Sequence, residues 1–458
     1  MTTETVPPEV APAKPVFDIG IDDRVRFSSA IGLGVQNILG MAGLLIFPAL
    51  IGTAFKLSTE DTAYLYGVTF MTSGLVVILQ SVFLLRLPII QGPYAGSLAA
   101  LLAVGHGSGG LGAAFGSMTV AGAIWCVLAL PLKRFGLITY LGRFVRDPII
   151  SGVIILILAT QLTSTALPNW LGTPESKGFP GINLLAGAVA AILVVVFTVL
   201  PKGTLLRRGA ALVAVVLGTV VYAVFEPTSF GEVGRNLGIT VPRLFPFGFA
   251  VQPDLVLIFF ITLLPAIAES IATYDIVAKW GGQELSAHRV SQGVFGEVLG
   301  STVGAVFGGM STLAYPDNIG LLRVTKVGSR YVTLTTGIIL LVLGGLKPFD
   351  RLLQAVPLPV LAAAGTVLFG VLFASAVDVL SGVEWTRENL MLAGVPFITA
   401  IGGLFIPAAS LHAMPMLVQL VFGQPLILGT LLLIVMKAGF GLTRGWSSAP
   451  PGNRPRGT

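Results

Sequence analysis

The chain has 458 residues, of which 54% are hydrophobic and only 10% are charged, and its formal net charge is +6. Because a soluble globular protein carries about 25% charged residues, this composition excludes a soluble enzyme, a coiled coil and a disordered chain. The apolar runs are long and continuous, whereas the strands of a membrane β-barrel alternate apolar and polar residues. The sequence therefore predicts an all-α polytopic membrane protein.

The residues that usually build enzyme and metal sites are few and scattered. Cys126 is the only cysteine, which excludes a disulfide framework, and His106, His288 and His412 show no metal-ligand spacing. No HExxH or GxSxG motif occurs, so we expect neither an enzyme nor a metal site or cofactor. The basic residues stand singly or in pairs between apolar runs, which argues against nucleic-acid binding and indicates a chain embedded in a lipid bilayer.

Apolar runs bounded by charged residues or proline predict about fourteen membrane-spanning segments. The first seven are expected at 28–51, 63–85, 89–104, 112–132, 147–166, 182–200 and 208–225. After a polar loop near 226–252, the second seven are expected at 254–278, 291–309, 313–326, 331–346, 356–375, 390–407 and 416–441. The third and tenth segments are unusually short, and Gly, Pro or polar residues interrupt them.

The distribution of Lys and Arg between the predicted loops indicates the orientation. With the N-terminus inside, most of the 27 Lys and Arg residues lie on the inner side, and the outer loops hold only Lys56, Lys177, Arg235, Arg243, Lys347 and Arg351. By the positive-inside rule, both termini are expected in the cytoplasm. The Pro-rich tail 1–27 is expected to be disordered there, and the polar tail 444–458 is expected on the same side.

Two strings of similar pattern suggest an internal repeat. The string GRFVRDPIISGVIILILA around Pro148 precedes the fifth segment, and DRLLQAVPLPVLAAAGTVLFG around Pro359 precedes the twelfth. The interrupted third segment, LPIIQGPYAG, likewise matches the interrupted tenth, STLAYPDNIG. Because seven is odd, the second set of seven must enter the membrane from the opposite side. Inverted repeats are typical of transporters, and paired broken segments point to the binding site.

Glu269 lies deep in the predicted eighth segment, and no basic residue stands three or four positions away. A carboxylate at this depth is costly unless a ligand, a proton or a partner attends it, and helical geometry places Thr273 over it. We expect Glu269 to anchor a substrate and to carry a coupling proton. The alternative is a structural carboxylate bonded to the backbone or to a neighbouring helix. Glu297, flanked by glycine in the ninth segment, is expected mainly to support helix packing or to bond across the core.

The tenth segment reads STLAYPDNIGLLRVTKVGSR. Pro316 disfavours helix at Tyr315, so the residues before it are expected to be extended and those after it to begin a half-helix, with Asp317 and Asn318 as N-cap residues. Free N–H groups at such a start can hold a ligand carbonyl, and Asp317 can accept from ligand N–H groups. The third segment has a similar break at 91–96, and extended backbone at membrane depth occurs only where it is buried or lines a cavity.

These strings resemble the nucleobase–ascorbate transporter family. Residues 318–326 fit its signature [Q/E/P]-N-x-G-x4-T-[R/K/G] from the second position on, and AIAESIATYD resembles the string around the family's glutamate in the eighth segment. LPIIQGP, PLPVLAAAGTVLFG and VQNILGM resemble family strings of the third, twelfth and first segments. The resemblance extends over about residues 28–441.

The resemblance implies fourteen spans in two inverted repeats of seven, with short antiparallel strands in segments 3 and 10 beside the substrate. Segments 1–4 and 8–11 would form a core domain, and segments 5–7 and 12–14 a gate domain. The corresponding boundaries are 28–132 and 254–346 for the core, 133–225 and 347–443 for the gate, and 226–253 for an extracellular loop. Members carry uracil, xanthine, uric acid or, in vertebrates, ascorbate, with H⁺ or Na⁺, and are often homodimers through the gate domain.

The resemblance also implies a set of site residues, with departures from the family pattern. Asp317 stands where Gln, Glu or Pro is usual, Ala95 stands where a stacking aromatic is expected, and Tyr94 is adjacent to it. Asn37 and Thr273 stand where uracil permeases have histidine. The expected substrate-binding residues are Glu269, Asp317, Asn318, Tyr94, Ala95, Tyr315, Thr273 and Gln91, and the expected coupling residues are Glu269 and Asn37.

The function expected from these residues is proton-coupled uptake of a nucleobase such as uracil, xanthine or a related planar heterocycle, across a bacterial cytoplasmic membrane. The alternative is a carrier or channel of the related anion-transporter fold. The carboxylates Glu269 and Asp317 disfavour that alternative, because they would repel an anion.

Overall fold

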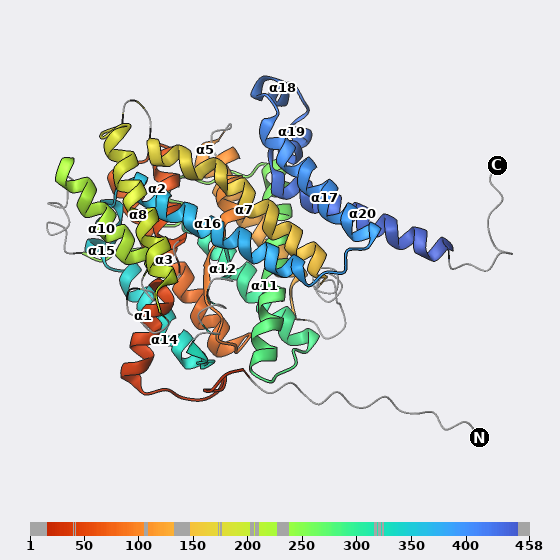
Figure 1. The fold of residues 1–458 in the computed structure, drawn as a ribbon, viewed down its shortest axis with the longest axis horizontal. Helices are drawn as coiled ribbons and strands as arrows, with labels where there is room; N and C mark the ends of the chain where they lie inside the picture. The colour runs from red at the N-terminus through yellow and green to blue at the C-terminus, as the bar shows by residue number, and fades with distance from the viewer. Residues whose placement is uncertain are drawn as a thin grey trace.

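The computed structural model describes residues 16–447 except 40, 42, 105–108, 132–146, 173, 175, 202–205, 207–209, 227–237, 316, 317, 319–321, 323 and 324. This part of the chain is mostly helical (Figure 1). Eight of its helices are long and apolar enough to cross a membrane, and three shorter apolar helices accompany them. The prediction of a helical membrane protein is therefore confirmed.

The elements follow the apolar runs of the sequence. The first half of the chain contains α1 (Phe27–Leu39), α2 (Gly43–Ala54), α3 (Thr59–Ile78), the π-helical turn η1 (Leu79–Phe83), β1 (Gln91–Pro93), α4 (Ala95–Val104), α5 (Gly110–Leu128), α7 (Pro148–Leu171), α8 (Gly181–Val199) and α10 (Ala210–Phe225). The second half contains α11 (Pro253–Trp280), α12 (Ala287–Val306), β2 (Thr312–Ala314), α14 (Arg330–Gly344), α15 (Lys347–Gln354), α16 (Leu358–Ser381), α17 (Arg387–Gly402), the 3-10 turn η3 (Gly403–Phe405), α18 (Ala408–His412), α19 (Met416–Gly423) and α20 (Pro425–Ser447).

Two elements differ from the segments read from the sequence. The predicted last segment, 416–441, consists of two helices, α19 and α20, which meet at Gln424. Pro425 lacks an N–H and has a fixed φ suited to a first helical position, so it begins a new helix. The short helix α15 was not predicted, because its eight residues include three charged ones and interrupt the apolar pattern.

The helices pack in pairs, and the pairing shows a symmetry between the two halves of the chain. Helix α3 packs along α14 and α12 packs along α5, while α1 packs on α14 and α11 on α5. In the same way α10 packs on α8, and α20 on α17. Helices α7 and α16 lie side by side across the middle of the molecule (Figure 1). Exchanging the two halves of the chain thus maps the α7–α16 pair onto itself and each of the other pairs onto another pair.

Glycine allows the close approach of α3 and α14. Gly67 and Gly74 are seven residues apart on α3, as Gly337 and Gly344 are on α14. A Cβ atom on Gly74 would lie 2.6 Å from the carbonyl oxygen of Gly337, and one on Gly344 would lie 2.5 Å from that of Gly67. Small residues at such a crossing let two membrane helices come into backbone contact.

The two broken segments meet as a buried antiparallel pair of strands. Gln91 of β1 lies opposite Ala314 of β2, and Pro93 lies opposite Thr312. The pairing continues past Pro93, where the Tyr94 N–H donates to the Ser311 carbonyl at 2.7 Å. The short ribbon is fully buried, so its backbone groups must be satisfied within the protein.

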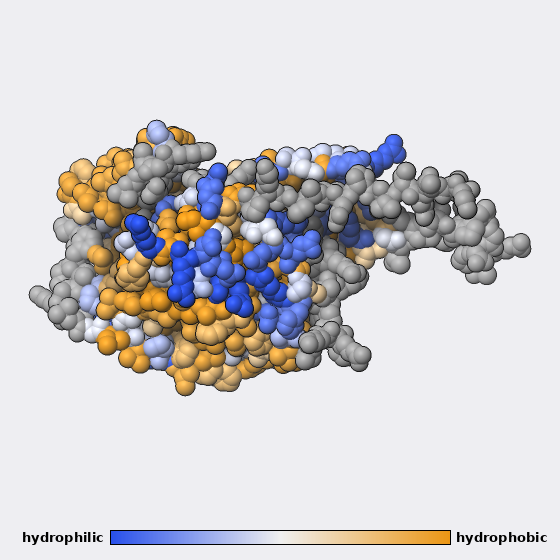
Figure 2. Space-filling view, turned by 90° about the horizontal axis from the view of Figure 1, so that it is seen from below, coloured by the Kyte–Doolittle hydropathy of each residue, from blue (hydrophilic) through white to orange (hydrophobic). Residues whose placement is uncertain are grey.

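A segment near the N-terminus crosses one face of the molecule. Ile19 forms a parallel bridge with Val327, Phe17 is buried against Gly328 and Trp280, and the carboxylate of Asp22 binds Arg330. Hydrophilic residues gather in the middle of this face, with hydrophobic residues along its margins (Figure 2). Residues 16–23 of the tail expected to be disordered are therefore ordered, because their apolar side chains find a packing site, and residues 1–15 lie outside the described chain.

Candidate functional site

Helix α11 carries Glu269 into the interior, where its side chain is 6% exposed. One turn later, the Thr273 hydroxyl donates to the main-chain carbonyl of Glu269 at 2.9 Å. Thr273 thus lies next to Glu269, as helical geometry requires, but its hydroxyl serves the backbone of α11. Ser270, which follows Glu269 in α11, accepts the N–H of Ala314 in β2 at 3.0 Å. The helix that carries the acid therefore also holds one strand of the ribbon.

Helix α12 holds the same strand from a second side. Ser301 accepts the N–H of Thr312 at 3.0 Å, and the Thr312 hydroxyl donates to the main-chain carbonyl of Glu297 at 3.4 Å. These bonds give β2 partners on α11, α12 and β1. Tyr315, which follows β2 directly, consequently leaves the ribbon at a point fixed relative to both helices.

Glu297 lies at the centre of this arrangement. Its side chain is 1% exposed, and the Tyr274 hydroxyl donates to its Oε2 at 2.8 Å. Ser270 and Gln91 lie beside the same carboxyl group, while its Oε1 makes no hydrogen bond within the described chain. The sequence indicated a residue that packs or bonds across the core. It did not show that Glu297 belongs to the polar cluster beside the ribbon.

Tyr94 brings an aromatic ring to the same region. It follows β1 directly, its side chain is completely buried, and its Oη makes no hydrogen bond to the described residues. The ring lies within electrostatic reach of Glu269 and Glu297. A Cβ atom on Gly96 would lie 2.3 Å from Cζ of Tyr94, so the ring occupies space that only glycine leaves open. Ala95, the other candidate of this segment, begins α4 and packs against the apolar clusters around it.

Two amide side chains are buried on the broken segments. Gln91 is 0% exposed and Asn318 is 3% exposed. The Gln91 amide lies beside the Glu297 carboxyl group and the Tyr274 hydroxyl, whereas the Asn318 amide makes no hydrogen bond within the described residues. The main chain of Asn318 is anchored, because its N–H donates to the Tyr315 carbonyl at 3.3 Å. A buried polar group without a partner costs about 1–3 kcal/mol, and such groups in a native protein call for a specific explanation. A ligand that supplies the missing partners is one.

The remaining candidates lie to one side of this cluster or outside the described residues. The Asn37 amide donates to the Thr336 hydroxyl of α14 at 3.0 Å, which ties α1 to α14. The Tyr315 ring packs over Gly92 and shares an apolar cluster with Met41, while its N–H continues the strand pairing. Asp317, another predicted site residue, lies outside the described residues.

The structure thus brings Glu269, Tyr94 and Gln91 together at the ribbon and adds Glu297. Thr273 lies one turn beyond Glu269 on α11, and Asn318 follows β2 by four residues. Carboxylates accept N–H groups, amides both donate and accept, and a phenol offers an apolar face with one polar atom. These groups suit a flat molecule with N–H and C=O groups on its edge. In the described part of the chain, no group of three or more His, Cys, Asp and Glu residues could hold a metal ion.

Comparisons with known proteins show the family to which the chain is similar. The profile of the Permease family matches residues 28–409. The chain is 27% identical to the uric acid permease PucJ of Bacillus subtilis, over 92% of this chain and 94% of that protein. It is 26% identical to the nucleobase transporter PlUacP of Paenibacillus larvae, over 92% and 96%. The inward-facing structure of the murine anion transporter Slc26a9 matches 92% of this chain and 70% of that chain with a TM-score of 0.58 at 12% identity, a likeness of fold alone.

Proposed function

The chain belongs to the permease family, and on that premise we propose that it is a secondary-active transporter that takes up a nucleobase with protons as the coupling ion. The observation that carries the proposal is the buried polar cluster at the strand pair, where two carboxylates, two amides and a phenol gather among apolar helices. Relatives with similar sequences are named as uric acid and nucleobase transporters. Uric acid and the common nucleobases are planar heterocycles, and most of them carry both N–H and C=O groups.

The residues divide into those that bind the ring and those that carry charge. The carboxylate of Glu269 accepts a ring N–H, and the amides of Gln91 and Asn318 bind the carbonyl and N–H groups of the ring edge. Tyr94 supplies the aromatic surface that Ala95 lacks, or donates its hydroxyl to the ring. A proton on Glu269 neutralises its carboxylate when the substrate leaves, because a charged side chain is costly at this depth.

The proposed architecture has fourteen segments in two inverted repeats. Its support is the exchange symmetry of the helix pairs together with the pairing of the two broken segments at one ribbon. We assign α1–α5 and α11–α14 to a core domain, and α7–α10 and α15–α20 to a gate domain through which two copies associate. Both termini are placed in the cytoplasm of a bacterial cell, so a reporter fused after Thr458 should report the inside and one fused after Lys177 the outside. A cytoplasmic signal at Lys177 would overturn this topology.

The experiment that tests the function is uptake of radiolabelled urate, xanthine and uracil into cells without nucleobase permeases of their own. We expect accumulation of at least one base above its external concentration, and its loss when a protonophore is added. Accumulation that survives the protonophore but requires Na⁺ would reject proton coupling and retain the transporter. Uptake of inorganic anions in place of every base would favour the anion-carrier alternative.

A further inference from the structure

An apolar groove of ≈ 450 Å³ lies beside α10, away from the polar cluster. Residues of α10 form one wall, and Leu45 of α2, Tyr66 of α3, Leu353 of α15 and Leu361 of α16 contribute to the others. Of the residues that line it, only Tyr66 and Thr219 are polar. The Tyr66 hydroxyl donates to the Leu45 carbonyl at 2.8 Å. The groove therefore offers a nucleobase almost none of the partners that its N–H and C=O groups require.

The dimensions of the groove match one half of a bilayer. On α10 its lining extends from Leu212 to Ala223, a rise of roughly 16 Å at about 1.5 Å per residue. The hydrocarbon core of a membrane is about 30 Å thick, so this length is close to that of one leaflet. Val216 and Val220, at the edge of the groove, are 52% and 55% exposed, and they leave the groove open toward the surrounding membrane.

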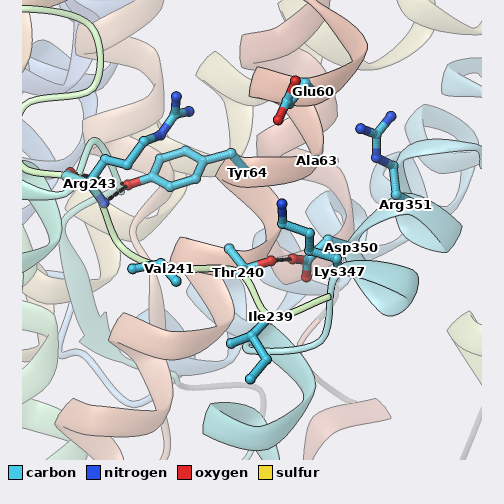
Figure 3. Close-up of a pocket in the computed structure, with 10 residues that line it drawn as sticks. All are labelled: Glu60, Ala63, Tyr64, Ile239, Thr240, Val241, Arg243, Lys347, Asp350 and Arg351. Carbon is cyan, nitrogen blue, oxygen red and sulfur yellow. Dashed lines mark hydrogen bonds between the residues drawn. The ribbon is translucent and has the colours of Figure 1, made fainter. Parts of the chain in front are cut away.

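Helix α15 borders the groove and carries charged residues. Phe349, Leu352 and Leu353 line the groove from one side of this helix. Lys347, Asp350 and Arg351, on its other side, line a separate polar cavity of ≈ 230 Å³. Figure 3 shows this polar side, where Lys347 and Arg351 extend from α15 and Tyr64 and Arg243 lie across the cavity. Such a helix, apolar on one side and basic on the other, is typical of the interface between lipid tails and headgroups.

One hydroxyl in the groove is not used by the protein. Thr219 is 7% exposed and its Oγ1 makes no hydrogen bond to the described residues. Other threonines in membrane helices bond to the carbonyl four residues earlier, as Thr262 does to Ile258 at 2.8 Å and Thr366 does to Ala362 at 2.9 Å. The Thr219 hydroxyl remains available to donate to a ligand oxygen.

We propose that the groove is a binding site for a membrane phospholipid, with one acyl chain along α10 and the headgroup phosphate beside the basic residues of α15. The apolar lining fits the chain, the length fits one leaflet, and the Thr219 hydroxyl donates to an ester oxygen. Lys347 and Arg351 complement the negative phosphate. The walls come from helices of both proposed domains, so the lipid occupies the seam between them.

The test uses phosphatidylglycerol with a photoreactive diazirine in one acyl chain, incorporated into nanodiscs with the full-length protein. After irradiation, peptides of α10 and α15 should carry most of the label. Ala223→Trp fills the groove and should lower this labelling about tenfold, equivalent to about 1.4 kcal/mol of binding free energy. Val220→Trp fills it from the exposed edge and provides a second variant should the first fold poorly.

The matched control is Val342→Trp on α14. Val342 is 56% exposed and does not line the groove, so this variant adds the same side chain to a lipid-facing helix and should leave the labelling of α10 unchanged. Label spread evenly over all lipid-facing helices would show a bulk lipid only and would overturn the proposal. Labelling of α10 that both filling variants leave intact would also overturn the proposal. A third contrary result is an unlabelled groove whose filling dissociates a dimer in native mass spectrometry, which would assign the groove to a second copy.

Discussion

The strand pair leaves no room for a side chain at Gly92, and this makes Gly92→Ala a sharp test of the site. An added Cβ would lie 2.4 Å from Cε2 and 2.6 Å from Cδ2 of Tyr315, and 2.9 Å from Cε of Met41. Ordinary contacts begin near 3.4 Å, so the ring or the strand must move by about 1 Å. Tyr315 is 8% exposed and Met41 is 1% exposed, and neither has open space to enter.

Overpacking of this kind typically costs about 1–3 kcal/mol. We therefore expect Gly92→Ala to lower the apparent Tm of the purified protein. If about 1 kcal/mol of the strain is relieved by displacing the ribbon from the substrate, the KM for uptake should rise about fivefold. Thermal unfolding in detergent and uptake kinetics, both normalised to the amount of protein in the membrane, measure the two effects.

Two comparisons isolate the cause. Gly32→Ala on α1 is the matched control, because no atom lies within 4 Å of its added Cβ and alanine favours a helix by up to about 1 kcal/mol over glycine. In a Tyr315→Ala background, Gly92→Ala should cost much less, because the ring that it meets is gone. Equal destabilisation in both backgrounds, or an unchanged Tm and KM for Gly92→Ala alone, would refute the proposed contact.

Three further predictions concern single side chains. Glu269→Gln keeps the size of the side chain but removes its proton, so the protein should reach the membrane yet lose accumulation against a gradient and the pH dependence of binding; normal pH-dependent accumulation would remove Glu269 from the mechanism. Gly96→Ala should weaken binding as much as Tyr94→Ala does, by about 1–3 kcal/mol if the ring stacks on the base, and competition assays that show unchanged affinity for both variants would place the site elsewhere. Burial raises the pKa of Asp350, in α15 outside the membrane spans, from 3.8 to about 8. The folded chain therefore holds a proton there that the unfolded chain releases, and stability should fall as pH rises from about 4 to 8. Asp350→Asn should flatten this fall in a series of Tm measurements, and an unchanged slope would contradict the assignment.

The helices could be predicted from the sequence because their causes are local. The fifth predicted segment, 147–166, corresponds to α7, in which Pro148 takes the first position and the Asp147 carboxylate accepts the Ile149 N–H at 3.2 Å. Both signals are visible in the string RDPI. The breaks at 91–96 and before Pro316 are likewise local, because proline and glycine interrupt an apolar run whatever surrounds it.

The polar cluster could be predicted only in part, because its contacts join distant segments. Glu269 can be predicted as a site residue because it is an acidic residue within an apolar run. Glu297 stands out equally, but its partner Tyr274 is 23 residues away and its neighbour Gln91 lies in the other half of the chain. Neither contact leaves a trace along the sequence. The ordered segment 16–23 could not be predicted for the same reason, since Phe17 packs against Gly328 and Trp280, which are far from it in the sequence.

The bonding around the ribbon also bears on how a substrate would move. The bonds that hold β2 run to α11 and α12, through Ser270 and Ser301. Toward α7 and α16 the contacts differ in kind: Tyr94 and Leu313 share an apolar cluster with residues of α7 and with Leu380 of α16. Hydrogen bonds fix direction and distance, whereas apolar contacts are non-directional. A displacement along α7 and α16 would therefore exchange one set of apolar neighbours for another and leave the bonds of the ribbon intact. We expect the ribbon, Glu269 and Glu297 to move as one unit, which would carry a bound base and its proton across the membrane together.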